Sequence, residues 1–217
     1  MSKRTWIIFA VLVIGIMVAL VVASRSGAPQ LDLSATDAST IQQASDSNGN
    51  IADHTYGKLD SKVILIEYGD YQCPPCGSAY PIVKQLVDKY SDQILFIFRN
   101  FPIPSLHPNA RAASAAAEAS GLQNKYWEMY DKLYENQSEW SSANASNRTT
   151  IFTNYASQIG LDTDQFVKDL SLSTIISKID FDIAIGKSVG INATPSFKLN
   201  GEDVTLNNLD SSIASKL

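Results

Sequence analysis

The feature that most constrains the fold is a Cys-Pro-Pro-Cys sequence at residues 73–76, which holds the only two cysteines of the 217-residue chain. A continuous apolar run at 63–68 precedes it, and a stretch with apolar residues at helical spacing, 78–90, follows it. Such a run is typical of a strand that is buried on both faces. We therefore predict a buried strand, a tight turn and a helix that begins at the cysteines.

This placement gives the two thiols different chemistry. At a helix N-terminus the dipole lowers the pKa of Cys73 and makes it reactive, while Cys76 lies three residues later on the same face. A bridge between them closes too short a loop to add much stability. The alternative is half of a zinc site, but structural zinc needs four ligands and only the isolated His54 and His107 remain. We predict a redox-active pair, with no metal and no cofactor.

Glu67 is a candidate proton carrier because it lies six residues before Cys73 inside the apolar run. A carboxyl group buried there would have a raised pKa. It could pass a proton to or from Cys76 as the disulfide opens and closes. The alternative, a glutamate at the end of a strand that faces water, stays open at this level.

Thr194-Pro195 is a candidate substrate-binding element. Proline at the start of a strand, here 196–199, is a position where a cis peptide bond is plausible. Packed against the cysteines, it would expose the backbone of Thr194 to an extended substrate. The dipeptide alone is weak evidence for this role.

The N-terminal region predicts export of the rest of the chain. Residues 6–23 are uncharged and apolar and follow Lys3 and Arg4, which is typical of a transmembrane anchor with its N-terminus in the cytoplasm. A cleaved signal peptide is the alternative. Residues 24–50 are polar and small, which predicts a flexible linker, and the globular domain then spans 51–217.

Within that domain the pattern predicts an α/β fold with an inserted helical block. A second apolar run, 94–98, completes a strand–helix–strand unit. From about 108 to 189 the periodicity is helical, with Trp127, Tyr130 and Tyr134 as core or groove-lining residues. Strands return at 196–199 and 202–206 around an Asn-Gly hairpin signal. We expect His107 to be structural and His54 to lie at the surface or linker edge.

Three segments together resemble the DsbA-like thioredoxin-fold family. They are Val-Ile-Leu-Ile-Glu-Tyr-Gly-Asp-Tyr-Gln-Cys-Pro-Pro-Cys at 63–76, Phe-Arg-Asn-Phe-Pro-Ile-Pro-Ser-Leu-His-Pro-Asn-Ala at 98–110, and Gly-Ile-Asn-Ala-Thr-Pro-Ser-Phe at 190–197. The resemblance extends over roughly 56–217 and is to membrane-anchored bacterial members.

This resemblance implies a thioredoxin fold with an inserted helical domain and assigns a role to each candidate residue. Cys73 corresponds to the nucleophile, Cys76 to the resolving cysteine and Glu67 to the buried acid. Pro195 corresponds to the cis-proline, with Thr194 before it. Where the best-known oxidases of the family have histidine, this chain has Pro75, so the direction of electron flow is left open.

The function predicted from these features is that of an extracytoplasmic oxidase that introduces disulfides into exported proteins. The resemblance implies two kinds of partner, exported proteins with cysteine pairs and a membrane quinone-linked oxidase. We expect a monomer at the bacterial cytoplasmic membrane, or a secreted protein if the N-terminal segment is cleaved. The acidic body argues against nucleic acid. The alternatives are a disulfide reductase or isomerase, and a tethered peptide-binding or chaperone module without redox turnover.

Overall fold

The computed structural model describes residues 4, 6, 9–17, 31, 33, 34 and 36–217, which fall into two units, Met1–Asp32 and Leu33–Leu217. In the first unit, residues 9–17 are helical. None of the helices in the described part of the chain has the length and apolar character needed to cross a membrane. The anchor predicted over 6–23 includes residues 7, 8 and 18–23, which lie outside the described part.

The second unit is built on a five-stranded sheet with the order β1-β3-β2-β4-β5. Strand β2 lies at its centre, parallel to β3 and antiparallel to β4, while β1 and β5 form antiparallel edges. The strands are β1 (Thr55–Gly57), β2 (Ile64–Gly69), β3 (Leu95–Asn100), β4 (Ser196–Leu199) and β5 (Glu202–Val204). The predicted strand–helix–strand unit is thus present, with α2 (Pro74–Lys89) joining β2 to β3.

Alternation along β2 divides the core into two faces. Leu65 belongs to the cluster that contains Val83 and Val87 of α2 and residues of α9 (Leu209–Ala214). Because successive side chains point to opposite faces, Glu67 and Gly69 share the α2 side with Leu65. On the other face, the Tyr68 ring lies against α8 (Ser173–Ser188), where a methyl group on Gly186 would come within 3.0 Å of it.

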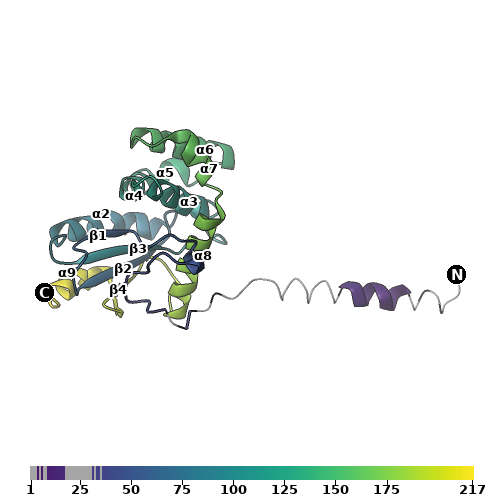
Figure 1. Cartoon of the computed structure of the whole chain (residues 1–217), viewed down its shortest axis with the longest axis horizontal. Coiled ribbons are helices and arrows are strands. Elements are labelled where there is room, and N and C mark those ends of the chain that lie inside the picture. The colour runs from purple at the N-terminus through teal and green to yellow at the C-terminus, as the bar shows by residue number, and fades with distance from the viewer. Residues whose placement is uncertain (1–3, 5, 7–8, 18–30, 32, 35) are drawn as a thin grey trace. The chain divides into compact units, whose positions relative to one another are not determined.

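A helical block lies between β3 and β4, and Figure 1 shows it gathered beside α2, with α8 leading back along the sheet. Its elements are α3 (Ala110–Gly121), α4 (Tyr126–Glu135), α5 (Gln137–Trp140), α6 (Ala145–Gln158), α7 (Thr163–Asp169) and α8. Small alanines let α3 pack closely with α4 and α8, and the aromatic face of α4 reaches the core around α2. The block therefore forms a wall next to the start of α2.

The prediction of a flexible linker over 24–50 is wrong for residues 36–50. Together with residues 51–53 they form a segment, here called the N-terminal strap (36–53), that packs on the sheet unit. The Arg99 guanidinium donates to the carbonyl oxygens of Ala38 and Thr40, each at 2.6 Å. Asn48, in a short 3-10 helix (Asp46–Asn48), is fully buried and donates to Gln43 O at 2.8 Å. Main-chain hydrogen bonds, which composition does not register, order this polar segment.

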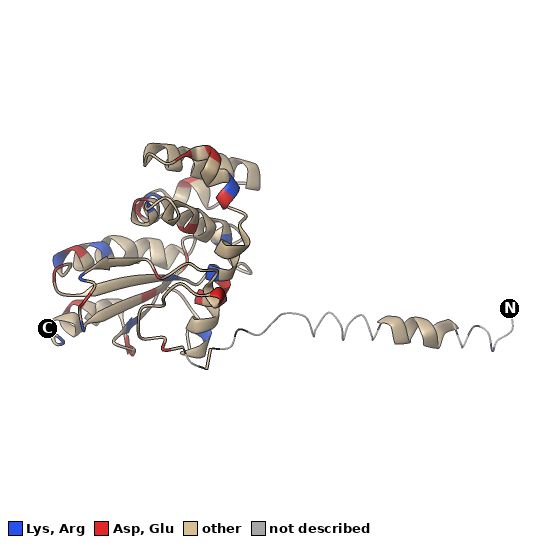
Figure 2. Cartoon of the chain, viewed as in Figure 1, with Lys and Arg blue, Asp and Glu red and all other residues tan. Residues whose placement is uncertain are grey.

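Acidic and basic residues are interspersed over the helices and strands (Figure 2). A few buried ones connect the strap to the sheet. Arg99 and Lys178 are buried and each lies 2.8 Å from the Asp53 carboxylate. Burial opposes ionisation of Asp53, but the two cations outweigh it and hold its pKa at about 2. His54 follows the strap directly and is half-buried. Its ring stacks on Tyr126 at 3.8 Å and its Nε2 lies 3.0 Å from Glu118, because the strap carries it into the protein.

Candidate active site

The site begins where the central strand ends. Strand β2 stops at Gly69, a three-residue turn follows, and Cys73 is the N-cap residue of α2. The Cys73 amide donates to Asp70 O at 3.0 Å, which closes the turn. Pro74 and Pro75 occupy the first helical turn, where an N–H would have no partner within the helix. The structure therefore puts Cys73 at the helix start that the sequence predicts.

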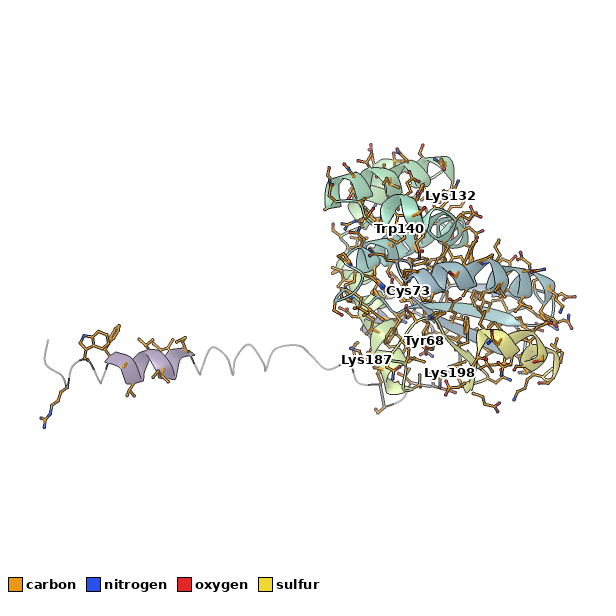
Figure 3. The ribbon with its side chains drawn as sticks, turned by 180° about the vertical axis from the view of Figure 1, so that it is seen from behind. Tyr68, Cys73, Lys132, Trp140, Lys187 and Lys198 are labelled. Carbon is orange, nitrogen blue, oxygen red and sulfur yellow. The ribbon has the colours of Figure 1, made fainter. Side chains whose placement is uncertain are left out.

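The environment of Cys73 favours its thiolate. A hydrogen bond from the Cys76 thiol is the largest cause that lowers the pKa of Cys73, to about 6. The Cys73 thiol also lies 3.4 Å from Thr194 O. Cys76 is fully buried, and its pKa is raised, first by the hydrogen bond to Cys73 and then by burial. The pair thus gives up its first proton at Cys73. Figure 3 shows Cys73 between the helical block, which carries Trp140, and the sheet, which carries Tyr68.

Glu67 lies inside the protein rather than in water. It is 1% exposed and sits opposite Phe98 on β3 and Phe197 on β4, so apolar side chains flank it. Desolvation alone raises its pKa to about 8. Its charge raises the pKa of Cys76, and the two groups are therefore electrostatically coupled. The water-facing alternative from the sequence is excluded.

Thr194 and Pro195 lie beside the cysteines in space, although they are far from them in the sequence. Strand β4 pairs antiparallel with β2, and Ser196 lies opposite Tyr68, so the residues before β4 arrive at the end of β2 where the cysteines begin. The Thr194–Pro195 peptide bond is cis. The structure therefore brings all five predicted residues to one place at the N-terminus of α2.

Residues that the sequence did not single out fix the turn. Asp70 accepts hydrogen bonds from the amides of Gln72 and Ile103, at 2.8 and 2.9 Å, and lies 2.8 Å from His107 Nδ1. From α5, Gln137 Nε2 donates to the carbonyls of Tyr71 and Cys73, at 2.8 and 2.9 Å. A side chain on Gly77 would meet the Gln137 amide.

Only one of these residues carried a signal in the sequence. An aspartate three residues before a helix start is typical of a turn in which the side chain accepts from nearby amides, so Asp70 could have been found. Gln137 lies 64 residues from Cys73, and no local pattern announces it. Within the described residues, no group of three or more His, Cys, Asp or Glu side chains could hold a metal ion.

Comparison with known proteins agrees with this architecture. A family model described as Thioredoxin matches residues 49–215. A thioredoxin-like oxidoreductase from Silicibacter pomeroyi is 27% identical, with a TM-score of 0.63 over 79% of this chain and 96% of that one. BdbD from Bacillus subtilis is 21% identical, with a TM-score of 0.67 over 82% and 97%. MdbA, a thiol-disulfide oxidoreductase from Corynebacterium diphtheriae, is 18% identical, with a TM-score of 0.63 over 86% and 99%.

The chain therefore belongs to the thioredoxin family. The solved structures named above include a thioredoxin-like oxidoreductase and a thiol-disulfide oxidoreductase, and the resemblance to the DsbA-like thioredoxin-fold group is confirmed. Curated relatives match over a portion only. A protein named Na⁺/H⁺ antiporter NhaA 1 in Mycolicibacterium vanbaalenii is 33% identical over 153 residues, and one of that name in Salinispora arenicola is 34% identical over 149. Each match covers 69% of this chain, which spans less than a quarter of those relatives, 23% and 22%.

Proposed function

We propose that this chain is an extracytoplasmic thiol–disulfide oxidoreductase that introduces disulfides into exported proteins through Cys73 and Cys76. The observation that carries the proposal is the asymmetry of the pair. Cys73 ionises with a pKa of about 6 beside the Thr194 carbonyl, whereas Cys76 is fully buried and coupled to a buried acid. A low-pKa nucleophile at a helix start, 5% exposed, with a partner that is fully buried is the arrangement that thiol–disulfide exchange needs.

The proposed oxidation begins with the disulfide form of the enzyme. A substrate thiolate attacks the Cys73 sulfur, the Cys73–Cys76 bond breaks, and Cys76 leaves with the electron pair and takes the proton of Glu67. The thiolate of the second substrate cysteine then attacks the sulfur of the first substrate cysteine in the mixed disulfide. The substrate disulfide forms and Cys73 leaves as a thiolate, so two electrons pass from substrate to enzyme. The low pKa of Cys73 makes it the better leaving group.

The surroundings of Thr194 support a polypeptide as substrate. A groove of about 590 Å³ is lined by residues 101–104, by α8 and by Ile191 and Asn192, which lead directly to Thr194. Its lining includes both apolar and charged side chains, among them the ion pair between Arg111 and Asp180. An extended chain in this groove would place a cysteine near Cys73 and its backbone near Thr194.

The partners and the location are also proposals. The apolar sequence at 6–23, with Lys3 and Arg4 before it, supports export across the bacterial cytoplasmic membrane. A quinone-linked membrane oxidase would then return electrons from the Cys73–Cys76 dithiol to the respiratory chain. Separation of cell fractions tests the location. Recovery of the chain in the cytoplasm would contradict it.

The proposed function is tested with the full chain and a reduced peptide that carries two cysteines. We expect the wild type to oxidise the peptide and Cys73→Ala to lose this activity, because the attacked sulfur is missing. Cys76→Ala should accumulate mixed disulfides through Cys73, which non-reducing electrophoresis detects. An unchanged oxidation rate in Cys73→Ala would contradict the enzyme and favour the peptide-binding alternative.

The reductase alternative is decided by the equilibrium of the pair with glutathione. The Pro-Pro dipeptide contributes no cation and no N–H to the Cys73 thiolate, so the driving force for oxidation rests on the helix start and on Cys76. A potential more oxidising than the glutathione pool is the expected result. One well below it would make the chain a reductase.

A further inference from the structure

Three buried polar atoms gather around the cysteines without a protein partner. Of the five buried side-chain atoms that lack a hydrogen bond within the described residues, three are Glu67 Oε2, Thr194 Oγ1 and the hydroxyl of Tyr134. Leaving such atoms unpaired costs free energy, so their concentration at one place calls for a functional reason. Glu67 and Thr194 already have roles in the proposed exchange. Tyr134, in the helical block, has none.

The Tyr134 hydroxyl lies against β2 at Gly69, where the absence of a side chain leaves room for it. A methyl group placed on Gly69 would lie 3.1 Å from the hydroxyl oxygen. Gly69 follows Glu67 by two residues on β2, so both face α2, and the hydroxyl lies on that same face. Aromatic packing holds the ring there, with Tyr71 at 5.0 Å, Tyr80 at 5.3 Å and Tyr130 at 5.1 Å between centroids.

The hydroxyl is a donor that keeps its proton. Burial raises the pKa of Tyr134 well above its usual value, and the charges of Cys76 and Glu67 raise it further. Two other buried tyrosines of the cluster have hydroxyl partners elsewhere. Tyr80 OH donates to Asp131 at 2.9 Å, towards the surface, and Tyr71 OH pairs with Tyr126 OH at 3.3 Å.

No cation competes for this role among the described groups that face the site. The titratable neighbours of Tyr134 are Cys76 and Tyr80 of α2, Glu67 of β2, Tyr71 of the turn and Tyr130 of α4. When Cys76 and Glu67 share one proton, a negative charge remains on one of them in an apolar setting. Such a charge needs a donor, because an uncompensated buried charge is strongly unfavourable.

We propose that Tyr134 is a positioning residue of this site, whose hydroxyl donates a hydrogen bond, directly or through one water, to the negative charge on Glu67 or Cys76 while the proton passes between them. This inference rests on the proposed function. Tyr134 is neither oxidised nor deprotonated. It holds the anion while Cys76 loses its proton to Glu67 and attacks Cys73 in the mixed disulfide, and the substrate thiolate leaves with the electron pair.

The test is Tyr134→Phe in the full chain, with glutathione linked to Cys73 as the mixed disulfide. The rate of glutathione release by Cys76 is measured from pH 5 to 10. In the wild type this rate should rise with pH around the Glu67 titration, near 8. Without the hydroxyl the charged forms lose a donor, so the midpoint should move up by about one pH unit and the rate at pH 7 should fall about tenfold.

Tyr80→Phe is the matched control, because its ring stacks on Tyr134 while its hydroxyl bonds to Asp131. It should leave the midpoint unchanged. A second readout, the pH titration of the Glu67 carboxyl carbon by NMR, should move upward in Tyr134→Phe alone. A midpoint and a carboxyl titration that both stay at the wild-type pH, or that fall, would overturn the proposal.

Failure of this inference can be told apart from failure of the proposed function. Alkylation of Cys73 by iodoacetamide reports the thiolate near pH 6 and should be the same in wild type and Tyr134→Phe. If peptide oxidation and this alkylation profile are as expected but the midpoint does not move, only the role of Tyr134 is wrong. If Cys73→Ala still oxidises the peptide, the proposed function itself is wrong.

Discussion

Burial of the Glu67 carboxyl group costs free energy and raises its pKa, which fits the proton transfer proposed for it. A carboxyl group between Phe98 and Phe197 in the central strand has lost its water and gained no protein partner for Oε2 within the described residues. A leucine there would give a more stable sheet. The raised pKa, about 8, leaves the group neutral at pH 7 yet able to ionise, which suits a residue that exchanges a proton with a buried thiol.

We predict that Glu67→Gln removes the pH dependence of disulfide resolution near pH 8. Glutamine keeps the size of the side chain but cannot accept the Cys76 proton, so release of glutathione from Cys73 should slow by roughly 10- to 100-fold. Stopped-flow release assays between pH 6 and 10 measure this. Glu202→Gln, at an exposed carboxylate on β5, is the control and should match the wild type. A mutant profile that still rises through pH 8 would show that another base serves Cys76.

At the residue scale the sequence predicts the chemistry but not its support. Cys73, Cys76 and Glu67 were identifiable because their signals are local: a spacing, a helix start, a charge in an apolar run. Thr194-Pro195 was weak evidence by itself, and its role was implied by the resemblance to the family. Tyr134 also lies at the helical spacing of a buried face, and the sequence interpretation as a core residue describes its ring correctly. What it misses is the hydroxyl, whose position depends on Gly69, 65 residues earlier in the chain.

Among the elements, the N-terminal strap shows where composition misleads. A polar segment with few large apolar residues normally stays disordered because it buries little surface. Here the guanidinium of Arg99 on β3 donates hydrogen bonds to main-chain carbonyls of the strap and to the Asp53 carboxylate, and these bonds hold the strap in place. Arg99 is itself fully buried and also donates to Tyr68 OH at 3.0 Å. The buried charge on β3 thus decides the fold of a segment about 50 residues away.

We predict that Arg99→Ala destabilises the domain and releases the strap. The change removes the donors of Ala38 O and Thr40 O and leaves Asp53 buried with Lys178 as its remaining cation, so the loss should be roughly 3–5 kcal/mol. Urea unfolding measures the loss, and limited proteolysis should cut within 36–50. Arg111→Ala, which breaks the exposed ion pair with Asp180, is the control and should cost about 1 kcal/mol or less. Equal losses in the two variants would mean that Arg99 does not hold the strap.

For the whole molecule, the active-site groups make global stability depend on pH in opposite ways. The folded pKa of Glu67, about 8, lies above the ordinary value of 4.5, so the native state binds the extra proton and stability falls as pH rises between these values. The folded pKa of Cys73, about 6, lies below the ordinary 9.0, so the native state releases the proton first and stability rises over that range. Between pH 6 and 8 the two effects oppose each other.

The variants should therefore separate two slopes that nearly cancel in the reduced wild type. Relative to the wild type, Glu67→Gln should gain stability with pH, by roughly 1.4 kcal/mol per pH unit between about 5 and 8. Cys73→Ser should lose stability over pH 6 to 8, since only the Glu67 effect remains, and the oxidised wild type should follow it because its sulfur cannot titrate. Urea unfolding at four pH values measures all of them, with Glu202→Gln as control. Parallel curves for the reduced and oxidised enzyme would contradict the stabilised thiolate. Folding and reduction form a thermodynamic cycle, so a reduced form that is more stable than the oxidised form makes the enzyme a stronger oxidant. The same measurement therefore also bears on the direction of exchange.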